Sequence, residues 1–294
     1  MICPKSCGII KVKKALKEGE NLSDANNQKE ITKLLDKYNQ LRKKTAKAIV
    51  KRDRMSYHTY VDYKTMYVTE IGELEYEFLK VENDLLKMRR KVEMIHSLMD
   101  NDEKIDISLI EHMLMKEFQD KDIKLKRMEQ DIEIASILRD DERLSRKDEN
   151  LMDKLYEEMI LELHPDINAE VTPDQDLDWE KIVWTYETSD LEAMVTLREL
   201  LDEGRPSYGL MEVDSYKLED RVEALKETLR RVKSEIEEMK TIFPFDVVDL
   251  LKDEKWLDEK KKELKENTEI YRDVEEELGN YLLKILPQNA IFKN

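Results

Sequence analysis

Residues that bend or interrupt a polypeptide are scarce in this sequence. Only 6 glycines and 6 prolines occur among 294 residues, and aromatic residues make up 7% of the chain. Charged residues, by contrast, make up 40%. A composition rich in Glu, Lys and Leu with few turn residues is typical of long helices and argues against a compact globule. We therefore expect an all-α fold.

Cysteine is limited to Cys3 and Cys7, so the sequence contains no disulfide framework. Their spacing could supply half of a zinc site, but no other cysteine or nearby histidine completes four ligands. We expect no metal and no cofactor, and we interpret residues 1–27 as a flexible tail. No apolar run approaches the roughly 18 residues of a membrane span, and the N-terminus lacks an apolar signal core. These absences favour a cytoplasmic protein without membrane partners.

A balanced charge is also absent, because the net charge is −17. The charge is uneven: residues 1–54 carry +9, so the rest of the chain carries −26. Basic residues crowd into one stretch, and four tyrosines follow at spacings that place them on one helix face. The set comprises Arg42, Lys43, Lys44, Lys47, Lys51, Arg52 and Arg54, then Tyr57, Tyr60, Tyr63 and Tyr67.

This basic and tyrosine-rich stretch has three interpretations. Basic residues beside aromatic residues could bind nucleic acid through phosphate contacts and base stacking. They could instead bind an acidic protein surface, including this chain's own acidic portion. The third interpretation is a solvated basic face beside a tyrosine-rich packing seam.

Apolar residues with coiled-coil spacing indicate how the long helices pack. After Gly72 they alternate steps of four and three residues, and a second such seam follows a polar break at residues 100–104. Two seams joined by a short break predict an antiparallel helical hairpin. The first seam runs Leu74, Phe78, Val81, Leu85, Met88, Val92, Ile95 and Met99, and the second Ile110, Leu114, Phe118, Leu125, Met128, Ile132 and Ala135.

A glycine- and proline-rich break at residues 204–209 predicts a domain boundary. The helix after it begins at Asp214 or Ser215 and has a third seam. We expect a last helix, about 254–286, to pack back on 215–241 as a second antiparallel hairpin. The third seam is Leu218, Val222, Leu225, Leu229, Val232, Ile236 and Met239. The predicted domains after the tail are 28–144, 145–203 and 210–294.

One stretch within residues 145–203 differs from this pattern. Leu151, Leu155, Met159 and Leu163 form an apolar stripe on a helix that Pro165 then ends. A Thr-x-x-Gln capping box with proline at the first helical position opens the next helix at residue 173. Its apolar face contains Trp179, Ile182, Val183 and Tyr186, and Ser189 is expected to cap the helix 190–202 after it. The pattern predicts a short helical hairpin with His164-Pro165-Asp166 at its bend.

This arrangement resembles the J-domain, the DnaJ-type co-chaperone module. The matching residues are Tyr156, Leu163, His164, Pro165, Asp166 and Asn168, then Tyr186, Glu187, Ser189 and Asp190. In that family, the His-Pro-Asp loop and the basic helix before it engage a DnaK-type ATPase chaperone and stimulate ATP hydrolysis. The resemblance implies that His164, Pro165 and Asp166 contact such a chaperone. The helix before the loop is acidic here, with three basic and six acidic residues between Arg146 and Leu163.

No enzyme motif occurs in the chain. It lacks a glycine-rich phosphate loop, His-Glu-x-x-His and Gly-x-Ser-x-Gly, and its carboxylates lie at helix-surface spacing beside lysine and arginine. We expect a non-enzymatic protein built from elongated antiparallel coiled-coil hairpins that flank a small J-domain-like hairpin.

Three functional hypotheses follow. In the first, the protein is an adaptor that links a client or an assembly to a DnaK-type chaperone. In the second, it is a scaffold subunit of a larger complex or of a homo-oligomer, with the J-like hairpin kept only as a packing unit, which the acidic helix favours. In the third, the basic 42–54 segment binds nucleic acid.

Overall fold

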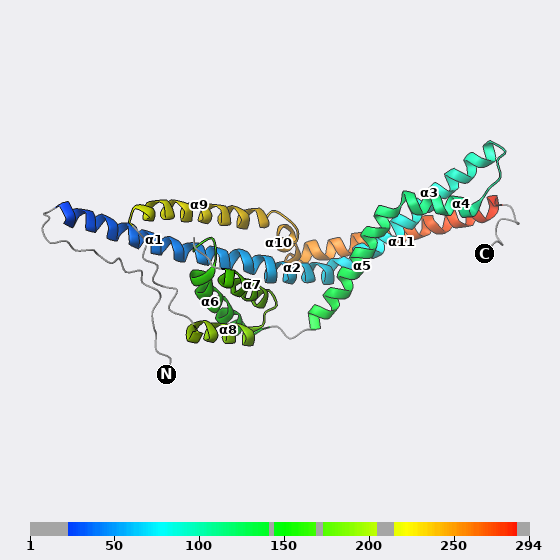
Figure 1. Ribbon diagram of the computed structural model, residues 1–294. Coiled ribbons are helices and arrows are strands. Elements are labelled where there is room, and N and C mark those ends of the chain that lie inside the picture. Colours follow the sequence, from blue (N-terminus) through cyan, green and yellow to red (C-terminus); the bar gives the residue numbers. More distant parts are fainter. Residues whose placement is uncertain (1–22, 141–143, 169–172, 205–214, 287–294) are drawn as a thin grey trace. The chain divides into compact units, whose positions relative to one another are not determined.

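The computed structural model describes residues 23–140, 144–168, 173–204 and 215–286 (Figure 1). The chain divides into two compact units, each made of two stretches that are distant in sequence. One unit comprises Met1–Val61 with Glu142–Ile242, and the other Asp62–Asp141 with Phe243–Asn294. This division differs from the consecutive domains that the sequence predicts, because each unit includes helices from both halves of the chain.

The first unit contains one long helix, a bundle of three shorter helices and a further long helix. They are α1 (Ser23–Arg54), the π-helical η1 (Met55–Thr59), α6 (Arg146–Leu163), α7 (Pro173–Glu187), α8 (Leu191–Gly204) and α9 (Ser215–Met239). The Ser145 hydroxyl accepts a bond from the backbone N–H of Asp148 and so caps α6. The α8 cap was predicted wrongly, since Asp190 rather than Ser189 accepts the N–H of Ala193, at 2.9 Å. Ser189 instead has a φ of 57° at the turn.

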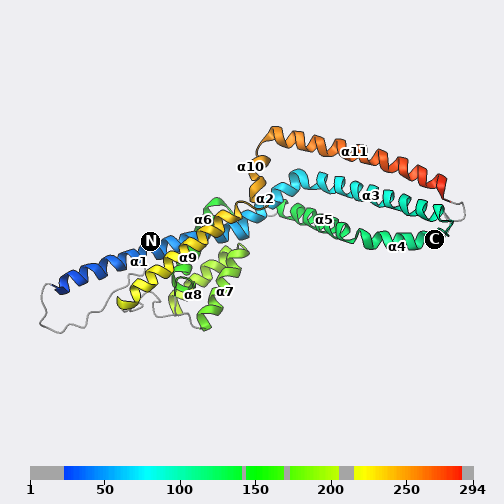
Figure 2. The same cartoon turned by 90° about the horizontal axis from the view of Figure 1, so that it is seen from above.

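The helix α9 packs along α1, and the two run in the same direction (Figure 1, Figure 2). Arg52 of α1 bonds Glu235 of α9 at 3.3 Å, and Ser56 lies 3.9 Å from Met239, so the C-terminal ends of both segments coincide. The predicted antiparallel pairing of 215–241 with 254–286 is therefore wrong. A seam indicates that a partner helix exists but does not specify which one.

The second unit is arranged around α3. The boundary between the units falls within α2 (Tyr60–Tyr67). The other elements are the π-helical η2 (Val68–Gly72), α3 (Glu73–Asp100), α4 (Ile107–Glu117), α5 (Gln119–Asp140), the 3-10 turn η3 (Phe245–Val247), α10 (Val248–Leu251) and α11 (Glu254–Ile285). In this unit α3 lies between α11 and α4–α5 (Figure 2).

Ion pairs and ring contacts fix the direction of each helix against α3. Lys87 forms a salt bridge with Asp122, and Lys64 forms one with Asp131, each with a nitrogen–oxygen distance of 2.6 Å. The later residue of α5 therefore pairs with the earlier residue of the α2–α3 segment. These helices are antiparallel. On the other side, Lys261 bonds Glu70 at 2.6 Å. Further along, the ring centroids of Tyr271 and Phe78 lie 5.3 Å apart, and those of Tyr281 and His96 lie 5.8 Å apart. The helix α11 is thus parallel to α3.

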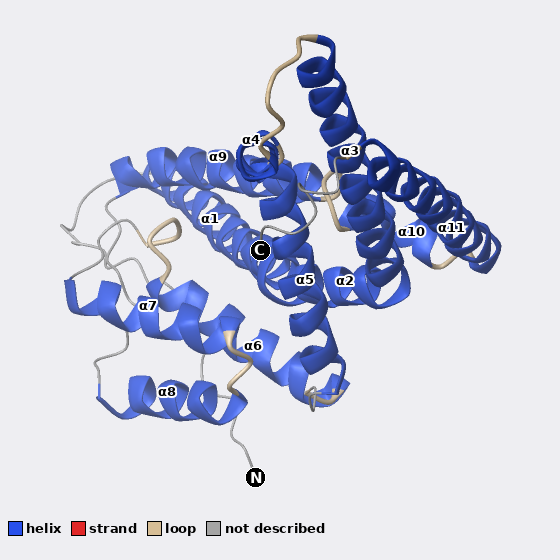
Figure 3. Cartoon of the chain, turned by 90° about the vertical axis from the view of Figure 1, so that its right-hand side faces the viewer, coloured by secondary structure: helices blue, strands red, loops and turns tan. Residues whose placement is uncertain are grey.

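Every regular element in the described residues is helical, and none of these residues forms a strand (Figure 3). The predicted all-α class is confirmed. None of the described helices combines the length and apolarity that crossing a membrane requires. Cys3, Cys7 and residues 205–209 of the predicted 204–209 boundary lie outside the described residues. The predicted tail 1–27 is too long at its C-terminal end, since α1 begins at Ser23.

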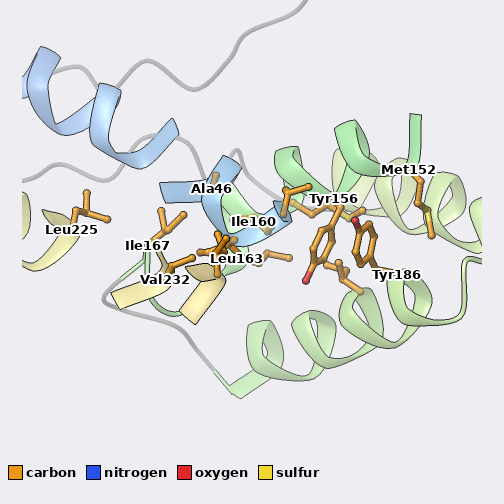
Figure 4. Packing of buried hydrophobic residues seen from close by; sticks show 14 of the residues in the cluster. Ala46, Met152, Tyr156, Ile160, Leu163, Ile167, Tyr186, Leu225 and Val232 are labelled. Carbon is orange, nitrogen blue, oxygen red and sulfur yellow. The ribbon is translucent and has the colours of Figure 1, made fainter. Parts of the chain in front are cut away.

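The core of the first unit is formed by buried residues of α1, α6, α7, α8 and α9 (Figure 4). Met152, Tyr156 and Ile160 are buried, whereas Leu151 is 41% exposed. The predicted apolar stripe of α6 is therefore displaced by one position at its start. Each such buried side chain contributes roughly 1.5–3 kcal/mol. This packing holds the bend after α6 against two other helices.

Candidate functional site

The bend that follows α6 begins at His164, whose extended backbone is the conformation that a residue before proline prefers. The His164 side chain is only 7% exposed. Its Nδ1 accepts the backbone N–H of Asp166 at 3.0 Å, and its ring meets Trp179 edge-on at 4.8 Å between centroids. Burial lowers the pKa of His164 to about 4, despite the opposing effect of the Asp166 carboxylate. His164 is thus a neutral packing residue at physiological pH.

Pro165 and Asp166 lie on the surface beside this buried histidine. The Asp166 carboxylate accepts a bond from Arg231 of α9 at 2.6 Å. The Asp166 side chain is 34% exposed and that of Arg231 is 49% exposed. The structure therefore separates the three residues of the predicted chaperone contact: one is buried, one is paired with α9, and Pro165 is exposed.

A second set of bonds ties the same bend to α1. Arg42 of α1 donates from Nη2 to the backbone carbonyl of Leu161 at 2.5 Å and to the Asn168 side-chain oxygen at 3.1 Å. The Asn168 amide in turn donates to the carbonyls of His164 at 3.2 Å and Leu161 at 3.4 Å. These bonds satisfy carbonyl groups at the C-terminus of α6 that have no partner within the helix. The bend is therefore held from α1 as well as from α9.

A buried polar network fastens α6 to α1. The Tyr156 hydroxyl donates to Asp53 at 2.8 Å, and Asp53 also accepts from Arg52 at 2.7 Å. Asp53 is 4% exposed. Sequence reasoning missed Asp53, although one signal was available: it is the sole acidic residue between Lys37 and Val61.

The two tyrosines that match the J-domain pattern stack on each other, with ring centroids 3.9 Å apart (Figure 4). Tyr186 donates from its hydroxyl to Asp153 at 2.7 Å, and Arg54 of α1 pairs with Asp153 and Glu149. Burial raises the pKa of Tyr156 and of Tyr186, and their acceptors on Asp53 and Asp153 raise it further. Both tyrosines are therefore neutral donors: Tyr156 joins α6 to α1, and Tyr186 joins α7 to α6.

The predicted basic cluster is divided by the fold. Arg42, Arg52 and Arg54 make the internal bonds described above. The lysines of the cluster are exposed: Lys43, Lys44, Lys47 and Lys51. The arginines, whose planar guanidinium groups can donate several bonds at once, serve the fold, and the lysines face solvent.

The predicted tyrosine face is also divided. All four tyrosines are partly buried, and Tyr57 packs against the core of the first unit. In the second unit, Tyr63 meets Phe245 edge-on at 5.6 Å, and Tyr67 meets Phe243 at 4.9 Å. The π-helical segments on both sides of α2 also alter the spacing on which a single face depends. These contacts occupy rings that the nucleic-acid interpretation requires for base stacking.

Within the described residues, no group of three or more His, Cys, Asp or Glu side chains could hold a metal ion. No protein family, curated protein or solved structure matches this chain. Function must therefore be inferred from the residues and their geometry.

Proposed function

We propose that this protein is a non-enzymatic helical scaffold in which the J-domain-like hairpin is a packing unit. The burial of His164 carries this proposal. A histidine that is 7% exposed, with its Nδ1 bonded and its ring against Trp179, has little surface left for a partner. The hairpin instead joins α6, α7 and α8 to the pair formed by α1 and α9.

The surroundings of the bend support the same conclusion. Asn168 and Asp166 are held by Arg42 and Arg231, which come from two different helices. A loop that binds a partner needs free polar groups on its surface, whereas here the polar side chains of the loop are bonded to α1 and α9. The acidic helix α6 is also unlike the basic helix of the J-domain family.

The test measures steady-state ATP hydrolysis by a DnaK-type chaperone in the presence of this protein. The scaffold proposal expects the wild type and the His164→Gln variant to give the same unstimulated rate. Circular dichroism should verify that the variant is still folded, and an authentic J-domain protein serves as the positive control. Stimulation by the wild type that is lost in a folded His164→Gln variant would overturn the proposal.

A chaperone adaptor is the second candidate, favoured by the exposure of Pro165 and by the partly exposed Asp166–Arg231 pair. Such a surface pair contributes only about 0–1 kcal/mol, so it can open. Replacing Arg231 by alanine would then free Asp166 and raise ATPase stimulation above that of the wild type. An unchanged rate would favour the scaffold.

Nucleic-acid binding is the third candidate, favoured by the four exposed lysines of α1. It predicts that single-stranded nucleic acid binds with an affinity that falls steeply as salt rises. Fluorescence anisotropy on the wild type and on a Lys43→Glu, Lys44→Glu, Lys47→Glu variant checks this. Binding that is absent, or that is equal in both proteins, would remove this candidate.

A further inference from the structure

The second unit contains a groove of about 710 Å³ that runs over α3 between α4 and α11. Figure 2 shows α3 lying between α11 on one side and α4–α5 on the other. Asp84, Met88 and Lys91 of α3 line the groove, and their spacing of four and three residues corresponds to about two helical turns. The groove thus follows one face of a helix and is bounded by two other helices.

Apolar side chains form much of the lining. Leu114 of α4 is 4% exposed and Leu282 of α11 is 7% exposed, whereas Met115 is 62% exposed. Opposite Met88, α11 carries Gly279, where an added Cβ would lie 3.9 Å from the Met88 sulfur. Methionine side chains are flexible and polarizable, so they adapt to the shape of an incoming apolar group.

The charges along the groove are unevenly compensated. Lys87 is bonded to Asp122 and Lys91 is bonded to Glu111. The remaining carboxylates, Asp84 and Glu275, are both half-buried, and among the described residues neither forms an ion pair. Burial and the nearby Asp84 carboxylate raise the pKa of Glu275. Arg272, three residues before Glu275 on α11, opposes this rise in pKa. Within the described chain, the groove therefore presents two acidic groups without an ion-pair partner beside an apolar surface.

We propose that this groove binds a basic amphipathic helix of a partner protein, which places lysine or arginine opposite Asp84 and Glu275. The apolar face of that helix lies over Met88 and Met115. A helix fits because its side chains at i, i+4 and i+7 repeat with the spacing of Asp84, Met88 and Lys91. In addition, α4, α3 and α11 are three adjacent helices, and a fourth helix in the groove would complete a four-helix bundle. This inference goes beyond the scaffold proposal, which concerns the first unit, so either can fail without the other.

The experiment uses the full chain and a fluorescein-labelled synthetic peptide of about 18 residues, five helical turns, made of leucine and lysine in an amphipathic pattern. A leucine and glutamate peptide of the same pattern is the charge control. Fluorescence anisotropy should show binding of the basic peptide only. The Asp84→Asn, Glu275→Gln variant should bind it about 10-fold more weakly, which corresponds to about 1.4 kcal/mol.

The matched control is the Asp273→Asn, Glu276→Gln variant. It removes the same charge from exposed positions of α11 that do not line the groove, and it should bind like the wild type. Equal weakening in both variants would show attraction to the net negative charge alone and would overturn the proposal. Binding of the acidic peptide, or of neither peptide, would overturn it as well.

Methyl NMR locates the site independently. With ¹³C-methyl methionine, the Met88 and Met115 signals should move on addition of the basic peptide, whereas those of Met152 and Met159 in the other unit's core should not. Shifts confined to other methionines would overturn the proposal. Met88 and Met115 shifts that depend on protein concentration without peptide would assign the groove to a second copy of the chain, which also overturns it.

Discussion

At the scale of single residues, His164 shows how a motif residue can be redirected by its surroundings. Its Nδ1 is engaged by the Asp166 backbone, its ring lies against Trp179, and its charged form is disfavoured because it is buried. The residue that the J-domain resemblance marks as a contact is part of the core. Protonation of His164 should therefore change the free energy of unfolding of the first unit.

His164 should make that stability depend on pH. Its pKa is lowered to about 4, against 6.5 for the ordinary group, so the unfolded chain binds more protons in that window. Stability should then fall as pH falls from 6.5 to 4, by up to about 3 kcal/mol. Urea unfolding at several pH values measures this, followed by tryptophan fluorescence in a chain whose Trp184 and Trp256 are replaced by phenylalanine, so that Trp179 is the reporter. The loss of stability caused by His164 is the wild-type loss minus the loss in the His164→Gln variant. If the free energy of unfolding depends on pH equally in both proteins, the prediction is wrong.

Asp102 is a residue whose backbone conformation suits glycine better. It has a φ of 55° at the end of α3, where the N–H of Glu103 bonds the Leu98 carbonyl at 2.8 Å and that of Asp102 bonds the Met99 carbonyl at 3.1 Å. Asp102→Gly should stabilise the protein by about 0.5–1 kcal/mol, because glycine adopts positive φ without steric cost. Asp102→Ala is the control, since alanine keeps the strain. Equal unfolding midpoints for the two variants would show that the strain is not the cause.

At the scale of elements, the parallel pairing of α1 with α9 defines the first unit. Arg52 and Glu235 lie near the C-terminal ends of both helices, and the α9 residues Leu218, Val222 and Val232 are buried. The position of α9 on α1 also brings Arg231 to the bend after α6. The direction of this pairing can be tested chemically.

A short bismaleimide should join cysteines placed at Arg52 and Glu235, in a chain whose Cys3 and Cys7 are replaced by serine. The residues suit this reaction because their charged groups lie 3.3 Å apart. A cysteine at the exposed Lys33 should not be joined to Glu235, since 19 residues of helix span about 28 Å. Mass spectrometry of the tryptic peptides identifies the cross-linked pair. The opposite pattern would mean that α9 runs antiparallel to α1.

At the scale of the whole molecule, the two units have separate cores. The cluster around Tyr156 and Tyr186 shares no residue with the clusters around Ile95 and Ile71. Stability can therefore be lost in one unit while the other remains folded.

Hydrogen exchange measured by mass spectrometry should resolve the two units. Ile182→Ala removes a side chain that is 1% exposed, and Ile95→Ala one that is 0% exposed; each should cost about 2–5 kcal/mol. Ile182→Ala should speed exchange in α6 and α7 and leave α4 protected. Ile95→Ala should speed exchange in α4 and leave α6 and α7 protected. Faster exchange throughout the chain in both variants would show that the units unfold together.

The local features of this protein can be recognised in its amino-acid sequence. The all-α class followed from composition, the end of α6 from Pro165, and the start of α7 from the Thr172 and Pro173 pattern. These features depend on interactions between residues that are near in sequence, so a reader of the sequence can recognise them. The candidate site was located in the same way, because His-Pro-Asp stands at a helix end.

Which helix packs against which became known from the folded structure. The apolar residues repeat with nearly the same spacing in every long helix of this chain. This spacing therefore could not show that α9 packs against α1 and α11 against α3. Nor could it show that Arg42 and Arg231 hold the bend or that His164 is buried. These outcomes depend on residues about 65 to 130 positions apart coming together, as do Arg231 with Asp166 and Arg42 with Asn168. The energy of such contacts depends on the packing of whole helices, which no short pattern records.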